Sequence, residues 1–278
     1  MRYLVSLLLS LLALPLAAQS QRPSHCIAIA DAAPGIEFIQ KASFRDPLDP
    51  FNVRISYIDH SMFLIQAASG PTAVTDYNGF IGVVDFVPDV VTMNNAHNTH
   101  WTALPDPAIP HVLEGWWQDG APASHRLEVG EMLVRNVTTD TRPGAFAFGS
   151  QEVNPDANSI FVFEVEGLCI GHMGHLHHVP DDAQYAALGR LDVVMVPVDG
   201  GFTLSTEEVR DMLGRLRSSL VLPMHWFSEA NLDRFLEEMA GNFVIRRTLE
   251  NSVSVSLRDL PSQPTIVVLR PQFLRNPR

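Results

Sequence analysis

Histidines gather directly behind apolar runs of this sequence, and this placement limits the fold more than any other feature. The runs are PDVVTMN (88–94), LCIGH (168–172) and SLVLPM (219–224). The histidines that end or follow them are His97, His100, His172, His175, His177, His178 and His225. Short apolar runs bounded by turn residues are typical of buried strands. Because loops behind buried strands meet at one edge of a sheet in α/β folds, we expect these histidines to lie close together.

The other apolar runs predict a chain in which strands come first and helices later. Further strands are expected at 51–58, 61–67, 72–77, 131–137, 159–165 and 192–198. Helices are expected near 181–188, 205–216 and 228–240. Ser205 and Glu208 fit a capping box, in which each side chain satisfies an exposed backbone N–H at the start of a helix. There is neither a glycine-rich phosphate loop nor a GxSxG nucleophile motif, so the histidines are the main chemical signal.

The first twenty residues predict a secretory signal peptide. Arg2 supplies the positive start, an apolar stretch follows from Leu4 to Leu16, and Ala18-Gln19-Ser20 gives a small-x-small end. The stretch is shorter than the ~20 residues of a membrane-spanning helix. We therefore expect an exported chain, periplasmic or secreted, that is cleaved near 18–20 and keeps no transmembrane segment.

The remaining chain is long enough for one large α/β domain. We expect an irregular, proline-containing lead-in at 21–50, the domain at 51–270 and a tail at 271–278. The formal net charge of −12 argues against nucleic acid or an anionic membrane as the main partner. Two cysteines permit one disulfide, but Cys169 also fits a buried free thiol, so the pairing of Cys26 with Cys169 stays open.

A metal ion explains the clustered histidines best. Imidazole nitrogens bind zinc, iron and copper, and three strand-end loops can bring several of them to one ion. The isolated histidines have ordinary surface or hydrogen-bonding roles; they are His25, His111 and His125.

Residues 51–228 resemble the metallo-β-lactamase fold superfamily, in particular the branch of ascorbate-phosphate lactonases and N-acyl-phosphatidylethanolamine phospholipases. The segment YIDHSMFLI resembles the glycine-histidine-small-serine turn of that branch, with His60 at the histidine. Asp76 matches the aspartate that ends the next strand, and NNAHNTHW matches the H-x-H-x-D-H signature. The segments DVVMVPVDGGFTL and LVLPMHWF match the last two strands, with His225 at the final metal-binding histidine. The resemblance implies an α/β fold, a four-layer αββα sandwich of two mixed sheets flanked by helices.

The metal positions depart from the pattern of that superfamily. Asn95 stands at the first histidine of the signature and Thr99 at its aspartate. Thr141 is expected at a further histidine position, and His175 replaces the bridging aspartate. The ligand set implied by the resemblance is therefore His97, His100, His175 and His225.

This ligand set predicts one divalent ion instead of two. Two dications about 3.5–4 Å apart repel strongly unless carboxylates and a hydroxide offset their charge. Four neutral imidazoles hold one dication without that help. Zinc is the first expectation, and iron or copper also suits nitrogen ligands, with Met173 beside the cluster.

Three further residues are candidates for catalysis. Asn95 is expected to donate to a developing oxyanion, and Asp140, or alternatively Asp59, to orient a water. Arg142 is expected either to bind a carboxylate or phosphate or to be a solvated loop residue. Asp140, Asp59 and Asp76 are candidates for orienting the imidazoles, although Asp76 equally suits a strand-end cap.

Two functions fit these residues. The first is a metal-dependent hydrolase that acts with a metal-activated water on a small ester, lactone, amide or phosphoester. An anionic substrate is one alternative within this function. The second is non-hydrolytic: a mononuclear iron, copper or zinc protein with a binding or redox role, or an inactive scaffold on the same fold.

Overall fold

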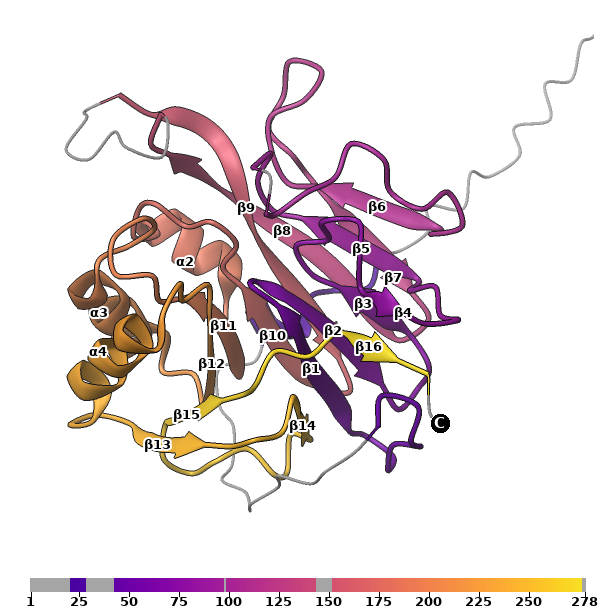
Figure 1. The fold of residues 1–278 in the computed structure, drawn as a ribbon. Coiled ribbons are helices and arrows are strands. Elements are labelled where there is room, and N and C mark those ends of the chain that lie inside the picture. The colour runs from indigo at the N-terminus through magenta and orange to yellow at the C-terminus, as the bar shows by residue number, and fades with distance from the viewer. Residues whose placement is uncertain (1–20, 29–42, 98, 144–151, 277–278) are drawn as a thin grey trace, which may run out of the picture.

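The strands lie in two large mixed sheets in the computed structural model (Figure 1), which describes residues 21–28, 43–97, 99–143 and 152–276. In spatial order the six-stranded sheet contains β14 (Ser252–Val255), β1 (Val53–Asp59), β2 (Met62–Ala67), β3 (Thr72–Val74), β5 (Val90–Met93) and β6 (His111–Glu114). The eight-stranded sheet contains β13 (Val244–Arg247), β15 (Thr265–Val268), β12 (Leu220–Met224), β11 (Val193–Pro197), β10 (Leu168–His172), β9 (Asn154–Val165), β8 (Met132–Thr141) and β7 (Arg126–Val129). The predicted signal peptide lies outside the described residues.

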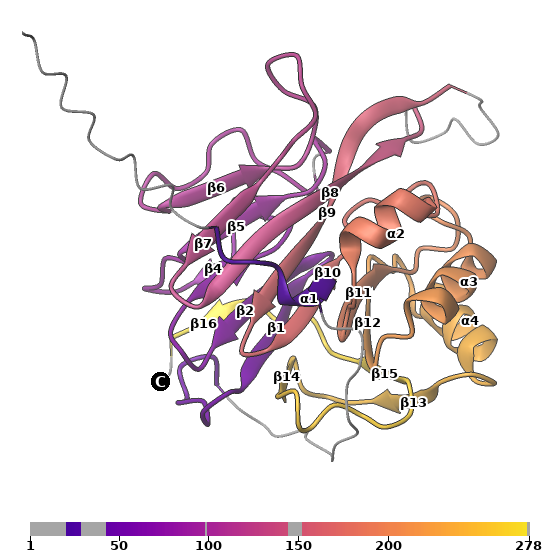
Figure 2. The same cartoon turned by 180° about the vertical axis from the view of Figure 1, so that it is seen from behind.

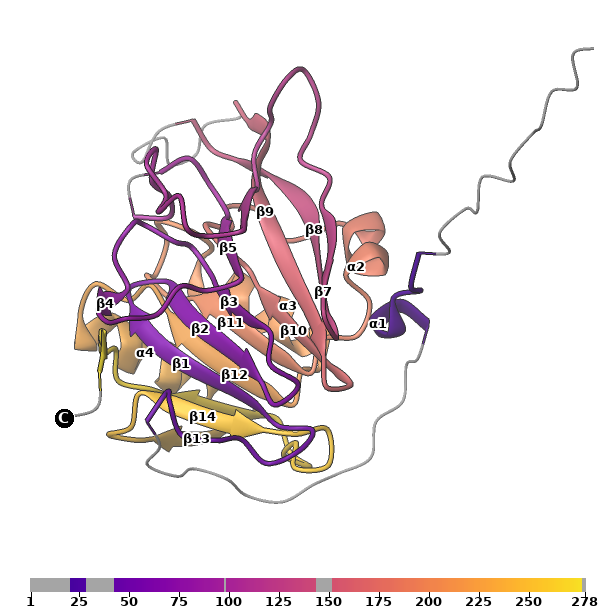
Figure 3. The ribbon, with the colours of Figure 1, turned by 90° about the vertical axis from the view of Figure 1, so that its right-hand side faces the viewer.

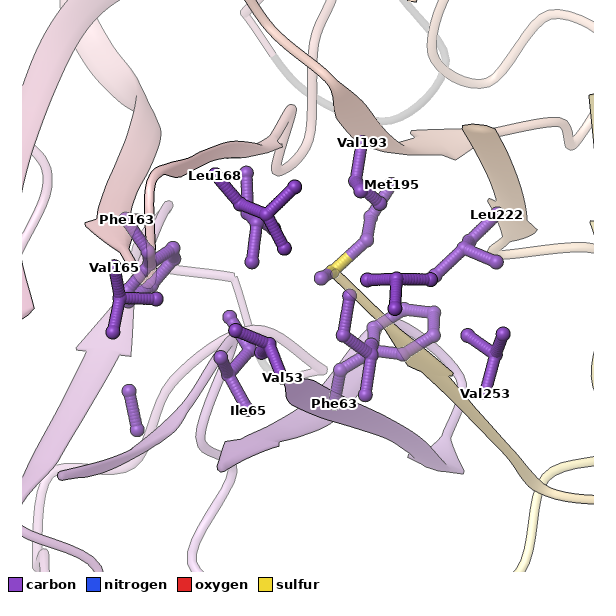
Figure 4. Packing of buried hydrophobic residues seen from close by; sticks show 14 of the residues in the cluster. Val53, Phe63, Ile65, Phe163, Val165, Leu168, Val193, Met195, Leu222 and Val253 are labelled. Carbon is purple, nitrogen blue, oxygen red and sulfur yellow. The ribbon is translucent and has the colours of Figure 1, made fainter. Parts of the chain in front are cut away.

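The two sheets pack face to face because side chains alternate along each strand. Figure 4 shows Phe63 and Ile65 of β2 facing Phe163 of β9 and Met195 of β11 across this core. Ile160 and Val162 alternate with Phe161 and Phe163 along β9. They point away from the second sheet and pack against the helices. Both faces of the eight-stranded sheet are therefore apolar, and each fully buried large aliphatic or aromatic side chain contributes roughly 1.5–3 kcal/mol.

Three helices cover the outer face of the eight-stranded sheet (Figure 1): α2 (Asp182–Leu188), α3 (Thr206–Leu216) and α4 (Glu229–Met239). The predicted capping box of α3 is confirmed, since Ser205 and Glu208 each accept a hydrogen bond from the other residue's backbone N–H. Asp181 and Gln184 form a second capping box at α2. The expected architecture of mixed sheets with flanking helices is confirmed.

The outer face of the six-stranded sheet is covered differently in the part of the chain that the structure describes. Loops and the short strands β4 (Gly82–Val83) and β16 (Leu274–Arg275) bury its apolar side chains. Leu274 is buried, and its backbone N–H bonds to Ile81. The segment predicted as a tail, 271–278, thus contains the strand β16, which pairs with β4.

A disulfide fastens the lead-in to the domain. The short helix α1 (His25–Ala28) lies beside α2 on the outer face of the eight-stranded sheet (Figures 2 and 3). Cys26 of α1 is bonded to Cys169 of β10 with a Cα–Cα distance of 5.8 Å. Glu164 adds to the attachment, since it accepts hydrogen bonds from Ser24 and from the backbone of His25. The open question about the two cysteines is thus answered by a bridge.

Strand ends from both sheets meet at one rim. The strands β10, β11 and β12 run parallel, and the loops behind all three lie there, facing the loop behind β5 and the β1–β2 turn. No helix among the described residues is long and apolar enough to cross a membrane.

Candidate metal centre

Four histidines from four separate loops lie together at this rim. His60 is in the β1–β2 turn, His100 in the loop behind β5, His175 in the loop behind β10, and His225 directly behind β12. The backbone N–H of His225 donates to the carbonyl of His60 over 2.8 Å, which joins the two sheets at the site. The topology thus brings residues 125 positions apart in the sequence into contact.

The central contact joins Nε2 of His100 and Nε2 of His225, which are 3.2 Å apart. Nδ1 of His100 lies 2.5 Å from the carboxylate of Asp76, and Nδ1 of His225 lies 2.9 Å from that of Asp199. A ring nitrogen beside a carboxylate carries the proton. With the protons on Nδ1, both neutral rings turn a bare Nε2 lone pair toward each other, and a cation between them would stabilise this arrangement.

Both buried carboxylates are fixed by backbone N–H groups. Asp76 also accepts from the backbone of Asn94, and Asp199 from the backbones of Gly201 and Thr203. Burial raises the pKa of Asp76 to about 6. Burial also raises the pKa of Asp199, but the imidazole of His225 at 2.9 Å and the N–H of Thr203 outweigh this and bring the value to about 2.

The spacing of the nitrogens fits a small divalent ion. Tetrahedral ligands at the usual Zn–N distance are about 3.3–3.4 Å apart. Nδ1 of His175 lies 3.1 Å from Nε2 of His100, next to the 3.2 Å between His100 and His225. Ligand nitrogens of His60, His100 and His225 all lie within 4.8 Å of one another. Nε2 of His60 is buried and has no hydrogen-bond partner in the described part of the chain, as expected for a nitrogen whose partner is an ion.

Burial keeps these imidazoles in the neutral form that binds metals. It lowers the pKa of His60 to about 3, with the neighbouring His225 adding to the shift. Burial and the same neighbour also place the pKa of His100 well below its ordinary value. Burial, followed by His100, lowers the pKa of His175. At neutral pH, no proton needs to leave these three rings before an ion binds.

Residues with strained backbone angles lie at the histidine cluster. His60, Asp76 and His225 have φ angles of 45°, 45° and 59°, in the left-handed region that non-glycine residues rarely adopt. Each such residue costs of order 1–3 kcal/mol, and such residues cluster at functional sites. The surrounding packing therefore fixes these three side chains more firmly than an ordinary loop would.

Another histidine near the centre, the buried His172, has a structural role. Its Nε2 lies 2.7 Å from the carbonyl of Ser61 and donates to it. Its Nδ1 accepts from the backbone of Gly174. Both ring nitrogens are therefore used within the protein, and neither is available to an ion.

A cavity of about 600 Å³ opens beside His175. Its polar lining includes His97, His177, Thr141 and Arg142. Its apolar lining is made by Ala96, Trp116, Trp117, Pro155 and Ala157. Such a mixture of aromatic walls and a few polar groups is typical of a small-molecule site.

The expected metal ligands lie together, with one at the margin. His100, His175 and His225 make the nitrogen contacts given above. The exposed ring of His97 stacks on His175 with 5.2 Å between ring centroids, and its Nδ1 is 3.4 Å from the hydroxyl of Thr99. His97 thus lies at the cavity wall; like His175, it is not in the group formed by His60, His100 and His225, whose ligand nitrogens all lie within 4.8 Å of one another.

The three expected catalytic residues have other partners. The amide of Asn95 donates to the carbonyl of Ala157, and the carboxylate of Asp140 accepts from the backbone of Asp156. The guanidinium of Arg142 donates to the carbonyls at 201–203. Arg142 and Asn95 line the cavity, but these contacts connect loops of the protein. Asp140 contacts none of the four rings in any hydrogen bond of the structure.

Two residues of the centre were not among the predicted metal ligands or catalytic residues. Asp199, directly behind the β11 strand, orients His225, and His60 supplies a fourth imidazole. The signal for Asp199 was an aspartate at the end of an apolar run and before Gly200-Gly201, the same pattern that marked Asp76.

Comparisons with known proteins agree with this architecture. Residues 54–225 match the β-lactamase superfamily domain. The chain is 25% identical over 225 residues to a UPF0173 metal-dependent hydrolase of Methanoculleus marisnigri, covering 78% of this chain and 97% of the relative. A relative of the same name from Lysinibacillus sphaericus is 24% identical over 195 residues, which is 63% of this chain and 85% of the relative.

Solved structures extend the comparison. A Thermotoga maritima protein assigned to the zinc-dependent hydrolases of the metallo-β-lactamase superfamily superimposes with a TM-score of 0.56 and 26% identity, covering 79% of this chain and all of that protein. A metallo-hydrolase of Ignicoccus hospitalis gives a TM-score of 0.52 at 16% identity, over 74% of this chain and 99% of that one, which shows a shared fold. With a family match over more than half of its length, this chain belongs to the metallo-β-lactamase superfamily.

Proposed function

We propose that this chain is an exported, metal-dependent hydrolase that uses one divalent ion on a small substrate. One observation carries the proposal: the bare Nε2 atoms of His100 and His225 face each other at 3.2 Å, while Asp76 and Asp199 occupy the opposite ring nitrogens. This pairing of carboxylate, imidazole and ion is the usual way in which proteins orient metal-binding histidines.

His60, His100, His175 and His225 would hold the ion. When bound, a divalent ion of this kind lowers the pKa of a water and polarises a carbonyl or phosphoryl oxygen. Zinc suits four nitrogen ligands best. The positions that would serve a second ion are occupied by Asn95, whose amide is bonded to Ala157, and by Thr141 at the end of β8. We therefore propose one ion and leave His97 outside its ligand set.

The cavity beside His175 supports a small, largely neutral substrate such as an ester, lactone or amide. Trp116 and Trp117 offer aromatic surface to an apolar group. Among the described residues that line the cavity, Arg142 is the only lysine or arginine, and its guanidinium donates to the carbonyls at 201–203. An anionic group in the cavity would thus compete with contacts that the protein already makes, which disfavours a phosphoester.

Export is supported by the disulfide between Cys26 and Cys169. Structural disulfides form and persist in oxidising compartments such as the periplasm or the extracellular space. Expression of the full chain in a bacterium should give a periplasmic protein that lacks residues 1–20. A cytoplasmic protein that keeps them would contradict export.

Hydrolysis is tested with the purified, zinc-loaded protein on 4-nitrophenyl acetate, an aryl lactone and bis(4-nitrophenyl) phosphate. We expect turnover of the ester or the lactone, loss of turnover in His100→Ala, and full turnover in the matched variant His111→Ala, which alters an isolated histidine of β6. Turnover that survives His100→Ala, or no turnover of any probe, would contradict the hydrolase.

The all-nitrogen ligand set also suits a redox metal, so a non-hydrolytic redox protein is a second candidate function. None of the four side chains that converge on the site is a carboxylate or a thiolate. Iron or copper with a visible absorption band after purification without added metal would favour this non-hydrolytic alternative.

A further inference from the structure

We propose that His177 is a hydrogen-bond donor for a carbonyl oxygen of the ligand in the cavity, and not a metal ligand. The inference rests on the proposed function of the same site, whose small-molecule cavity His177 lines.

The backbone of Arg142 fixes the tautomer of His177. Its N–H donates to Nδ1 of His177 over 2.8 Å. A backbone N–H can only donate, so Nδ1 must keep its lone pair. The proton of the imidazole is therefore on Nε2, and a protonated nitrogen cannot bind an ion.

His177 lines the cavity, and its Nε2–H group lacks a hydrogen-bond partner in the described part of the chain. His177 is only 8% exposed, and its Nε2 is buried without a hydrogen bond. A buried donor left without an acceptor is costly, so such atoms point to a partner from outside the protein. Its ring centroid lies 4.7 Å from that of His175, one of the proposed ligands of the ion.

His175 and His177 therefore have different roles in this arrangement. His175 turns a nitrogen toward His100, while His177, two residues on, lines the same cavity and has its proton on Nε2. An N–H donor there would bind the oxygen of an ester, lactone or amide carbonyl and would strengthen its bond as negative charge develops. A positioned donor of this kind needs no formal charge, in keeping with a cavity for neutral substrates.

The tautomer is tested by NMR of the ring nitrogens in protein labelled with ¹⁵N-histidine, before and after zinc is added. We expect Nε2 of His177 to be protonated and Nδ1 bare in both states, whereas Nε2 of His100 and His225 shifts on binding zinc. Zinc bound at Nε2 of His177, or a proton on its Nδ1, would overturn the proposal whatever the activity of the protein.

The donor role is tested by the affinity of the zinc-loaded protein for benzohydroxamate, which carries a carbonyl oxygen and an aromatic ring. His177→Asn keeps an acceptor for the N–H of Arg142 at Oδ1 but removes the Nε2 donor. We expect roughly 10- to 100-fold weaker binding, the usual effect of a hydrogen bond to a charged group. His178→Asn, the same exchange one residue on and outside the cavity lining, should bind like the unaltered protein.

The outcomes separate the two proposals. Equal affinity in all three proteins would overturn the role of His177 and leave the metal centre intact. A protein that holds zinc but does not bind the hydroxamate would overturn both, since the ion and the cavity would then not be joined. A protein that does not bind zinc would contradict the proposed function, and the NMR spectrum without metal would still decide the tautomer.

Discussion

Replacement of Asp199 by asparagine should weaken metal binding about 100-fold. Asp199 uses Oδ1 for the backbone N–H groups of Gly201 and Thr203, at 3.0 and 2.9 Å, and its Oδ2 lies 2.9 Å from Nδ1 of His225. In Asp199→Asn the amide oxygen must take the place of Oδ1, because only it can accept from the two N–H groups. The amide nitrogen then faces Nδ1 of His225.

That exchange reverses the tautomer of His225. An amide N–H donates to Nδ1, so the proton of the ring moves to Nε2, the atom that faces His100. Loss of an orienting carboxylate alone costs about 10- to 100-fold in metal affinity, and the blocked Nε2 places this variant at the upper end. The expected change in binding free energy is about 3 kcal/mol.

The assay is a competition for zinc between the protein and a chromophoric chelator at neutral pH. Asp192→Asn is the matched control: Asp192 is also buried and bonded to a backbone N–H, but it lies before β11 and pairs with Arg190. This control should keep the affinity of the unaltered protein. An unchanged zinc affinity in Asp199→Asn, with circular dichroism showing a folded protein, would show that Asp199 does not set the tautomer of His225.

Three further predictions follow from other parts of the structure. Asp76→Asn should weaken zinc binding as Asp199→Asn does, because Asp76 likewise bonds a backbone N–H with one oxygen and His100 with the other; the same competition assay checks this. Cys26→Ser removes a bridge across 143 residues and should lower the free energy of unfolding by about 2–5 kcal/mol in urea titrations, with zinc content unchanged; equal stability would contradict a structural role for the bridge. Burial raises the pKa of Glu164, but bonds from Arg135 and Ser24 outweigh it and hold the value below the ordinary 4.5, so this carboxylate stabilises the fold above that pH and loses its effect as the pH falls through its folded pKa. Glu164→Gln should therefore flatten the loss of stability between neutral and acidic pH, and an unchanged slope would show that other carboxylates dominate.

Much of the fold could be predicted because local signals agreed with the final packing. The run at 192–198 is apolar on both faces because it is a central strand, β11, with the second sheet on one side and helices on the other. The capping residues Ser205 and Asp181 mark helix starts that are independent of tertiary structure. The strands β6, β7 and β13 were missed because they are short and partly exposed, so their sequences lack an apolar run.

The candidate site was predictable only in part, because its geometry depends on contacts between distant loops. Strand-end position was enough to single out His100 and His225. It could not show that the exposed ring of His97 lies at the cavity wall and stacks on His175, which depends on the conformation of its loop. The approach of the β1–β2 turn to β12, which brings His60 to His225 with 4.0 Å between ring centroids, is a tertiary contact that no local pattern encodes.

The number of ions per chain, measured in the unaltered protein and in variants of His225 and His97, tests directly whether the protein has a single metal centre. Elemental analysis of the purified protein should find one ion per chain. That ion should be lost in His225→Ala and kept in His97→Ala. Two ions per chain, or an ion lost equally in both variants, would contradict a single centre formed by His60, His100, His175 and His225.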